Sequence, residues 1–219
     1  MNIISRIIIV DDHPLFREGM RLLIEKEGMG QVIAEAENGL EFLDLLKQNE
    51  PDLVLMDIEM PFMNGIDATN RALTERPGLK ILALTMLRER EDYLAMLNAG
   101  AMGFVAKTAG KHELEKAIKT VTEGESFFPN EILRQIILSS GATRQISNNT
   151  KDGKLLLTER EHEVLRHFCE GMTASEISKK LFRSIKTIEA HRSKLLEKTG
   201  TKNTINLILF AIRNKLVDL

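Results

Sequence analysis

The sequence predicts an α/β fold with a five-stranded doubly wound parallel sheet, followed by a small all-α domain. Over residues 1–125, five short apolar runs alternate with amphipathic helical patterns. Several of these runs are too uniformly apolar for a sheet that has one face in water. From residue 155 onward only helical patterns remain. A length of 219 residues suits two domains of ordinary size.

The predicted strands are the apolar runs themselves. They are RIIIV (6–10), QVIAEA (31–36), DLVLM (52–56), KILALT (80–85) and GFVAK (103–107). The first, third and fourth do not alternate with polar residues, so we expect helices to cover both of their faces. A helical pattern follows each run, and the first of these patterns contains Leu15, Met20, Leu22 and Leu23. Five such units with short connections form an open parallel sheet.

Residues 126–153 are predicted to connect the sheet domain, residues 1–125, to the second domain, residues 154–219. The segment NEILRQIILSS (130–140) has the pattern of one more helix. The stretch SSGATRQISNNTKDG (139–153) has almost no large apolar side chains and is typical of a flexible linker.

The second domain is predicted to contain four helices with a helix-turn-helix arrangement. Thr158 is followed three residues later by Glu161, and Thr173 in the same way by Glu176, which is the spacing of a capping box. The third helix starts at Ser184 in this prediction, and KNTINLILFAIRNKLV (202–217) forms the fourth.

The net charge of −2 conceals an asymmetry between the two halves. Residues 1–150 carry 16 Lys and Arg against 23 Asp and Glu, a net of −7, and residues 151–219 carry 14 against 9, a net of +5. The basic half is therefore a candidate for binding nucleic acid. No apolar run approaches the roughly 20 residues of a membrane span. The single cysteine, Cys169, excludes an internal disulfide framework and favours a cytoplasmic location.

Polar residues gather where the predicted strands end. Asp11 and Asp12 follow the first strand, Asp57 the third, Thr85 the fourth, and Lys107 ends the fifth. The carboxyl ends of parallel strands share one edge of a sheet, where functional residues collect. Three converging carboxylates repel one another unless a cation lies between them. Mg²⁺ with a hydroxyl and an ammonium nearby suits phosphoryl transfer to Asp57.

Residues 1–125 resemble a CheY-like receiver domain, through VDDH (10–13), LMDIEMPFMNG (55–65), Leu84-Thr85 and GFVAK (103–107). The resemblance implies the flavodoxin-like strand order 2-1-3-4-5 and a phosphoacceptor at Asp57. It also implies a Mg²⁺ site formed by Asp12, which binds directly, Asp11, which binds through water, Asp57 and the backbone carbonyl of Glu59. Lys107 and Thr85 would contact the phosphoryl group. Phe104 would be the aromatic residue at the switch position.

Two residues depart from the receiver pattern. Thr108 stands where many receivers have a cis-proline, which leaves the geometry of that loop open. Phe104 stands where Tyr is common, so the switch position has no hydroxyl. Simpler interpretations also exist: the two aspartates alone are compatible with a solvated strand end or a helix cap, and His13 with a structural or solvated residue.

The segment LTEREHEVLRHFCEGMTASEISKKLFRSIKTIEAHRSKLLEKTGTKN (157–203) resembles a LuxR/NarL-type DNA-binding domain. Ile188, His191 and Leu195 share one helix face, which we expect to turn inward. The remaining faces present the candidate DNA-binding residues Lys186, Thr187, Glu189, Ala190, Arg192, Ser193 and Lys194. We expect the Arg and Lys residues of this set to contact mostly DNA phosphates. Glu189 would either accept a hydrogen bond from a cytosine amino group or disfavour binding to other DNA sequences.

The sequence as a whole is identified as a member of the NarL/FixJ-type response regulators, which are not enzymes. The resemblance implies phosphorylation by a sensor histidine kinase, a homodimer when phosphorylated, and binding to double-stranded promoter DNA. RNA polymerase is a further candidate partner, and no membrane is expected. Three alternatives stay open: a haloacid-dehalogenase-type enzyme, a flavodoxin-like electron carrier, and a regulator that works without phosphorylation. The first of these requires a second Asp at the position of Glu59.

Overall fold

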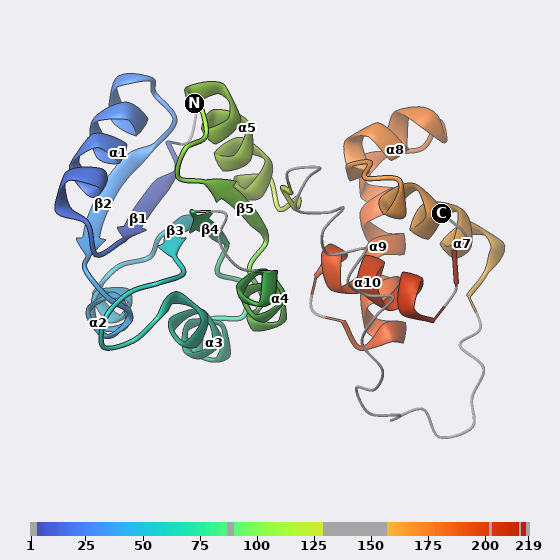
Figure 1. Ribbon diagram of the computed structural model, residues 1–219. Coiled ribbons are helices and arrows are strands. Elements are labelled where there is room, and N and C mark those ends of the chain that lie inside the picture. The colour runs from blue at the N-terminus through green and yellow to red at the C-terminus, as the bar shows by residue number, and fades with distance from the viewer. Residues whose placement is uncertain (1–3, 87–89, 129–156, 202, 215, 218–219) are drawn as a thin grey trace. The chain divides into compact units, whose positions relative to one another are not determined.

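The chain folds as two compact units, Met1–Pro129 and Asn130–Leu219. The computed structural model describes residues 4–86, 90–128, 157–201, 203–214 and 216–217 (Figure 1). The predicted helix at 130–140 and the predicted linker at 139–153 lie outside the described residues. Among the described residues, no helix combines the length and hydrophobicity that a membrane crossing requires.

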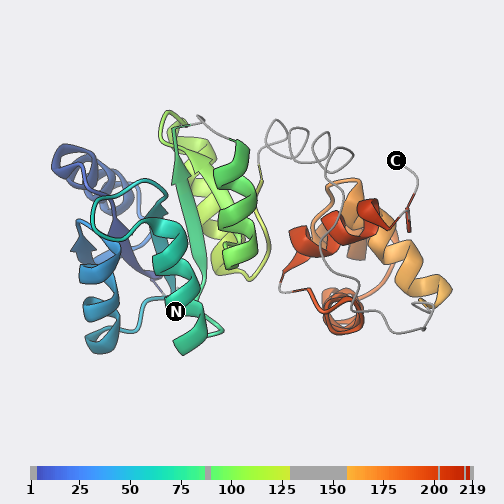
Figure 2. The ribbon, with the colours of Figure 1, turned by 60° about the horizontal axis from the view of Figure 1, so that its bottom comes forward.

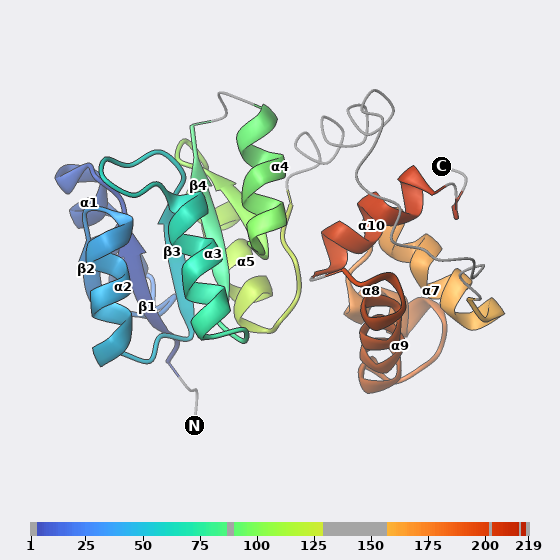
Figure 3. The same cartoon turned by 90° about the horizontal axis from the view of Figure 1, so that it is seen from below.

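The N-terminal unit is a five-stranded parallel sheet with the order β2-β1-β3-β4-β5, which confirms the predicted fold. Helices α1 and α5 cover one face, and α2, α3 and α4 lie side by side on the other (Figures 1 and 3). In chain order the elements are β1 (Arg6–Val10), α1 (Pro14–Lys26), β2 (Gln31–Ala36), α2 (Gly39–Gln48), β3 (Leu53–Asp57), α3 (Gly65–Glu75), β4 (Ile81–Thr85), α4 (Arg90–Ala99), β5 (Gly103–Ala106) and α5 (Lys111–Thr122).

The central strands are buried on both faces, as their unbroken apolar composition predicts. Ile7 and Ile9 of β1 belong to the same core cluster as α5 residues such as Leu114. Their neighbours in sequence, Ile8 and Val10, are also fully buried, although they point to the opposite face. Layers of helices on both sides of the sheet (Figure 2) explain why alternation is absent.

Helix α1 corrects one part of the predicted pattern. Met20 and Leu23 pack against the core, but Leu15 and Leu22 are 83% and 59% exposed. The buried positions of the helix include Arg17, which is 8% exposed. An apolar count at helical spacing therefore identified the helix but not the side that it buries.

The C-terminal unit contains α7 (Glu159–Cys169), α8 (Ala174–Lys180), α9 (Ile185–Thr199) and α10 (Thr204–Arg213). Capping boxes start α7 at Thr158 and α8 at Thr173, and the Ser184 side chain accepts a hydrogen bond at the start of α9. Helix α9 packs against α7, α8 and α10. The four predicted helices and their three starts are thus confirmed.

Candidate functional site

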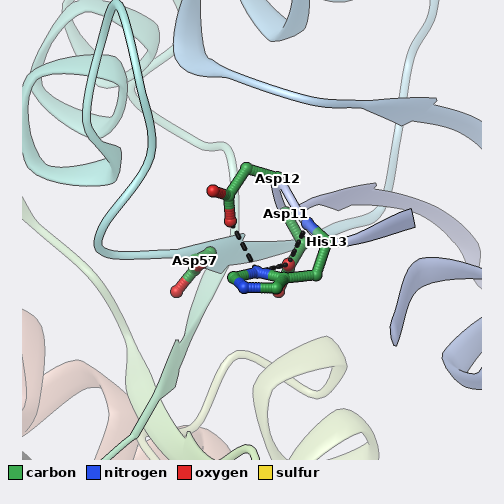
Figure 4. Close-up of side chains that lie close together, drawn as sticks. All are labelled: Asp11, Asp12, His13 and Asp57. Atoms are coloured by element: carbon green, nitrogen blue, oxygen red, sulfur yellow. Dashed lines mark hydrogen bonds and ion pairs between the residues drawn. The ribbon is translucent and has the colours of Figure 1, made fainter. Parts of the chain in front are cut away.

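The strand ends bring the three predicted carboxylates together. Asp11 follows β1 and is fully buried, Asp12 comes next with 29% of its side chain exposed, and Asp57 ends the adjacent strand β3 at 4% exposure. Figure 4 shows these side chains converging with that of His13. The ligand atoms of these four residues all lie within 4.8 Å of one another.

Lys107 supplies a positive charge to this cluster. Its Nζ lies 2.6 Å from Asp11 Oδ2 and 2.7 Å from Asp57 Oδ2. The same ammonium lies 5.0 Å above the ring of Phe16, within the range of a cation–π contact. Burial opposes the charged form, but the hydrogen bonds to the two carboxylates raise the pKa of Lys107 above its usual value.

The carboxyl group of Asp57 titrates unusually. Burial raises the pKa of Asp57 from 3.8 to about 6, and the nearby charge of Asp11 acts in the same direction. The hydrogen bond from Lys107 and the backbone hydrogen bond from Ile58 oppose this rise only in part. Lys107 is shared between Asp57 and Asp11, so it compensates the buried charge of ionised Asp57 only in part.

The donor set fits a hard divalent cation. Carboxylate oxygens are the ligands that Mg²⁺ prefers. Asp11 Oδ2 and Asp12 Oδ1 are buried oxygens without a regular hydrogen bond, although each forms an ion pair, with Lys107 and with His13 respectively. At 2.6 and 2.7 Å both contacts are favourable even without hydrogen-bond alignment, because charge attraction tolerates poor alignment.

The start of α3 fixes the position of Asp57. Asp57 Oδ1 accepts a hydrogen bond of 2.8 Å from the backbone N–H of Ile58. The Ile58 carbonyl in turn accepts from Gly65 N at 2.9 Å. A Cβ atom at Gly65 would lie 1.9 Å from the Asp57 carbonyl oxygen, so only glycine permits this close approach. The glycine of the motif MNG (63–65) therefore allows the backbone to hold Asp57 in position.

Two residues near Asp11 were not predicted as part of the site. His13 Nδ1 lies 2.7 Å from Asp12 Oδ1 and 3.2 Å from Asp11 Oδ1, although the ring is 70% exposed. The buried Arg17 donates a 2.5 Å hydrogen bond to the backbone carbonyl of Asp11 and another to Glu37. The position of His13 directly after Asp11 and Asp12 indicates that it lies near the site. Nothing local in the sequence indicates that Arg17 turns inward.

Thr85 lines the same cavity as Asp57 and Lys107, and Phe104 lies in β5, the strand that ends directly before Lys107. Thr85 is 6% exposed at the end of β4, and its hydroxyl lies 3.5 Å from that of Tyr93, a long contact. Phe104 is fully buried, with its ring edge-on to Tyr93 at a centroid distance of 5.3 Å. The peptide bond between Lys107 and Thr108 is trans, which resolves the open geometry of that loop.

A cavity of about 590 Å³ opens beside the acidic cluster. Asp57, Thr85 and Lys107 line its polar side, and Glu59, with an exposed side chain, also lines it. Its apolar lining includes Leu15 and Phe16 of α1, Ile58 after β3 and Met86 after β4. The cavity gives a reactant access to a carboxylate that is otherwise buried.

Helix α9 carries the predicted DNA-binding residues. Ile188 and Leu195 are buried and His191 is half-buried, so the predicted inward face is confirmed. On the other faces, Lys186, Ala190, Ser193 and Lys194 are exposed, and Thr187, Glu189 and Arg192 are partly exposed.

Helix α9 takes part in two ion pairs that were not predicted. Glu189 Oε2 lies 2.5 Å from an Arg192 terminal nitrogen on the same helix. Glu161, only 3% exposed, accepts a 2.7 Å hydrogen bond from Lys198 and so ties the C-terminal part of α9 to α7. Spacing along the helix permits the first pair, but the second joins residues that meet only in the folded unit.

Comparison with known families decides the identity of the chain. The family described as response regulator receiver domain matches residues 7–119, and the family described as bacterial regulatory proteins, luxR family, matches residues 155–211. The chain belongs to the NarL/FixJ-type response regulators. Members of this group are DNA-binding transcription regulators of two-component systems, as the sequence predicted.

Relatives match this response regulator over nearly the whole of the given sequence. Response regulator GacA of Pseudomonas viridiflava is 35% identical over 97% of this chain and 98% of its own. Oxygen regulatory protein NreC of Staphylococcus carnosus (strain TM300) is 32% identical over 97% and 99%. A solved structure of the RcsB response regulator of Salmonella typhimurium, 31% identical, covers 99% of both chains with a TM-score of 0.58. A solved RcsB–DNA complex is 29% identical and covers 96% of this chain and 99% of its own, with a TM-score of 0.57.

Proposed function

We propose that Asp57 of this response regulator is the residue that a sensor histidine kinase phosphorylates. The observation that carries the proposal is the position of its carboxylate: it stands at the end of β3, shares the Lys107 ammonium with Asp11, and opens to the cavity of about 590 Å³. A nucleophilic carboxylate needs access and a means of neutralising the charge of an incoming phosphoryl group. The cavity provides the first and Lys107 part of the second.

Mg²⁺ is the proposed cofactor, held by Asp11, Asp12, Asp57 and the backbone carbonyl of Glu59. When bound, it neutralises negative charge on the phosphoryl oxygens. Support comes from the clustering of the ligand atoms within 4.8 Å of one another and from the pKa of Asp57, which burial raises to about 6 with a further contribution from the charge of Asp11. Lys107 is proposed to contact the phosphoryl group, and the Thr85 hydroxyl to donate to it.

The proposed reaction is an in-line phosphoryl transfer. One Asp57 carboxylate oxygen forms a bond to phosphorus while the bond from phosphorus to the kinase histidine nitrogen breaks. The bonding electrons stay on that imidazole nitrogen, which takes up a proton from solvent. Lys107 stays protonated throughout, in keeping with its raised pKa. The product is an acyl phosphate at the end of β3.

The proposed output is promoter recognition by a homodimer. The residues of α9 predicted to contact DNA are Lys186, Thr187, Glu189, Ala190, Arg192, Ser193 and Lys194. A single small helix-turn-helix unit offers limited contact, so two units on two half-sites are needed for useful affinity. Thr85 and Phe104, which both adjoin Tyr93, are proposed to pass the change at Asp57 to helix α4. RNA polymerase stays a candidate partner.

The proposed receiver domain spans residues 1–125, and the proposed DNA-binding domain spans residues 154–219. Residues 126–153 are proposed to connect them. A cytoplasmic location is proposed because both the kinase and the DNA must reach the protein. The match to both families leaves the dehalogenase-type and flavodoxin-type alternatives without support.

The test is phosphorylation of the full chain by acetyl phosphate or a partner kinase with Mg²⁺. The unmodified chain is expected to incorporate one phosphoryl group and Asp57→Asn none. Asp52→Asn, at an exposed carboxylate that pairs with Arg6, is the matched control and should be labelled like the unmodified chain. Labelling of Asp57→Asn at the normal rate would refute the assignment.

A further inference from the structure

The end of helix α8 has an unusual residue in a demanding backbone position. Phe182 N–H donates to the Lys179 carbonyl at 3.4 Å, and Arg183 N–H donates to the Ser178 carbonyl at 2.9 Å. These two hydrogen bonds form a Schellman motif, which requires the residue after the cap to adopt a left-handed conformation. Phe182 does so, with φ of 51°.

The chain itself indicates which residue that position favours. The same pair of hydrogen bonds ends α1, α4, α5, α7 and α9. In each of these five cases the left-handed residue is glycine: Gly28, Gly100, Gly124, Gly171 and Gly200. Glycine has no Cβ and adopts positive φ without steric cost, whereas a bulky side chain does not. Among the six equivalent helix ends in the described residues, only α8 therefore carries a conformational penalty.

Packing within the unit does not offset this penalty. Phe182 is 91% exposed, so its ring removes almost no apolar surface from water. Ile185, at the start of α9, is likewise 50% exposed. The position thus combines a strained backbone with an exposed aromatic ring, and both features disfavour the isolated folded state.

The surroundings of Phe182 match a polyanion. Residues 177–188 contain four Lys and Arg and no acidic residue. Lys179, Arg183 and Lys186 are all exposed around the turn. Lys186 lies in the first turn of α9, where the peptide dipoles add positive potential. An apolar ring bordered by cations suits DNA, whose phosphates flank deoxyribose faces and thymine methyl groups.

We propose that Phe182 is a DNA-contacting residue that packs against a sugar or a thymine methyl beside phosphates held by the neighbouring cations. The inference rests on the proposed DNA-binding function of this unit and adds a contact outside the recognition helix. The ring supplies apolar burial, and Lys179, Arg183 and Lys186 supply charge. The strain at φ of 51° is then retained because DNA binding, not folding, uses the side chain.

The test compares substitutions at Phe182 in the full chain saturated with beryllofluoride and Mg²⁺. The probe is a labelled duplex that the unmodified chain selects from a random pool, with Kd from anisotropy at several salt concentrations. Phe182→Asn, which tolerates left-handed backbone, is expected to raise Kd about tenfold. Its salt slope should match that of the unmodified chain, because an apolar contact releases no counterions. Calorimetry should give an unchanged or higher Tm for the C-terminal unit.

Three further variants separate the effect of the ring from the effects of charge and of position in the chain. Phe182→Tyr keeps the ring and should bind within about twofold of the unmodified chain. Lys186→Ala should reduce the salt slope by about 0.9, the value for one phosphate contact. Phe62→Asn is the matched control, because Phe62 has φ of 66° and 88% exposure but lies in the receiver unit. It should leave the Kd for DNA unchanged.

Several results would overturn the inference. Normal DNA binding by Phe182→Asn would overturn it, and so would weak binding together with a lower Tm, because the role of Phe182 would then be structural. A reduced salt slope like that of Lys186→Ala would contradict an apolar contact. If the beryllofluoride-saturated Phe182→Asn variant no longer formed a dimer on gel filtration, the partner of the Phe182 ring would be a second copy of the chain instead of DNA. If the unmodified chain selects no duplex at all, the proposed function fails instead, which is a distinguishable result.

Discussion

Replacing Asp57 by Asn is expected to stabilise the receiver unit against unfolding, by an amount that grows with pH. The carboxamide has nearly the shape of the carboxylate but no charge to desolvate. Lys107 keeps its ion pair with Asp11 at 2.6 Å, so the substitution leaves no buried ammonium without a partner. The gain therefore measures the cost of the buried Asp57 charge.

The magnitude follows from the pKa of Asp57, about 6 in the fold against an ordinary value of 3.8. Below pH 3.8 the group is protonated in both states and burial of the carboxyl carries no charge penalty. As pH rises, the unfolded chain ionises first, and the fold loses stability until ionisation is complete in both states. Linkage gives a penalty of about 1.6 kcal/mol at pH 5 and about 3 kcal/mol at pH 7.5. The advantage of Asn should thus grow by about 1.4 kcal/mol over that interval.

Tyrosine fluorescence provides a selective assay in metal-free buffer. The chain has one Tyr and no Trp, and Tyr93 lies in α4 of the receiver unit. Urea unfolding followed at this fluorophore reports that unit and not the C-terminal one. Adding Mg²⁺ should then stabilise the unmodified chain more than the variant, because the variant lacks one proposed ligand. A stability difference that stays constant from pH 5 to pH 7.5 would refute the reasoning, and a lower stability of the variant would refute it more strongly.

Three other predictions follow from single contacts. Asp12→Ala should weaken Mg²⁺ binding, measured by calorimetry, more than Asp11→Ala does, because Lys107 already neutralises Asp11; the reverse order would contradict the ligand assignment. Glu161→Gln should lower the free energy of unfolding of the C-terminal unit by about 2 kcal/mol at pH 7, since its carboxylate binds Lys198. Burial opposes ionisation, but the hydrogen bonds from Lys198 and Thr158 together lower the pKa of Glu161, so this difference should shrink as the pH falls below the ordinary value of 4.5. Cys169 should resist a thiol reagent at pH 7.5 until urea is added, because burial raises its pKa to about 12; rapid labelling of the folded chain would contradict this.

Sequence patterns predicted those features that depend on neighbouring residues. The unbroken apolar runs predicted a sheet covered on both faces, and S/T-x-x-E spacing predicted two helix starts to the residue. The receiver motifs predicted that Asp11, Asp57 and Lys107 converge, because strand ends in a parallel sheet meet at one edge.

Features that depend on tertiary contacts were not predictable in this way. Arg17 turns inward because its guanidinium donates to the Asp11 carbonyl and to Glu37 and also pairs with Glu35. Lys198 and Glu161 are 37 residues apart in sequence and meet through packing of α7 on α9. The left-handed backbone of Phe182 was equally hidden, since LFRS contains neither Gly nor Asn.

The most direct test of the account measures DNA affinity of the full chain before and after phosphorylation, with the modified residue mapped by mass spectrometry. The account predicts one acyl phosphate, on Asp57, and a lower Kd for the selected duplex that Asp57→Asn does not reproduce. Phosphorylation at a different residue, or an unchanged Kd after complete modification of Asp57, would contradict it.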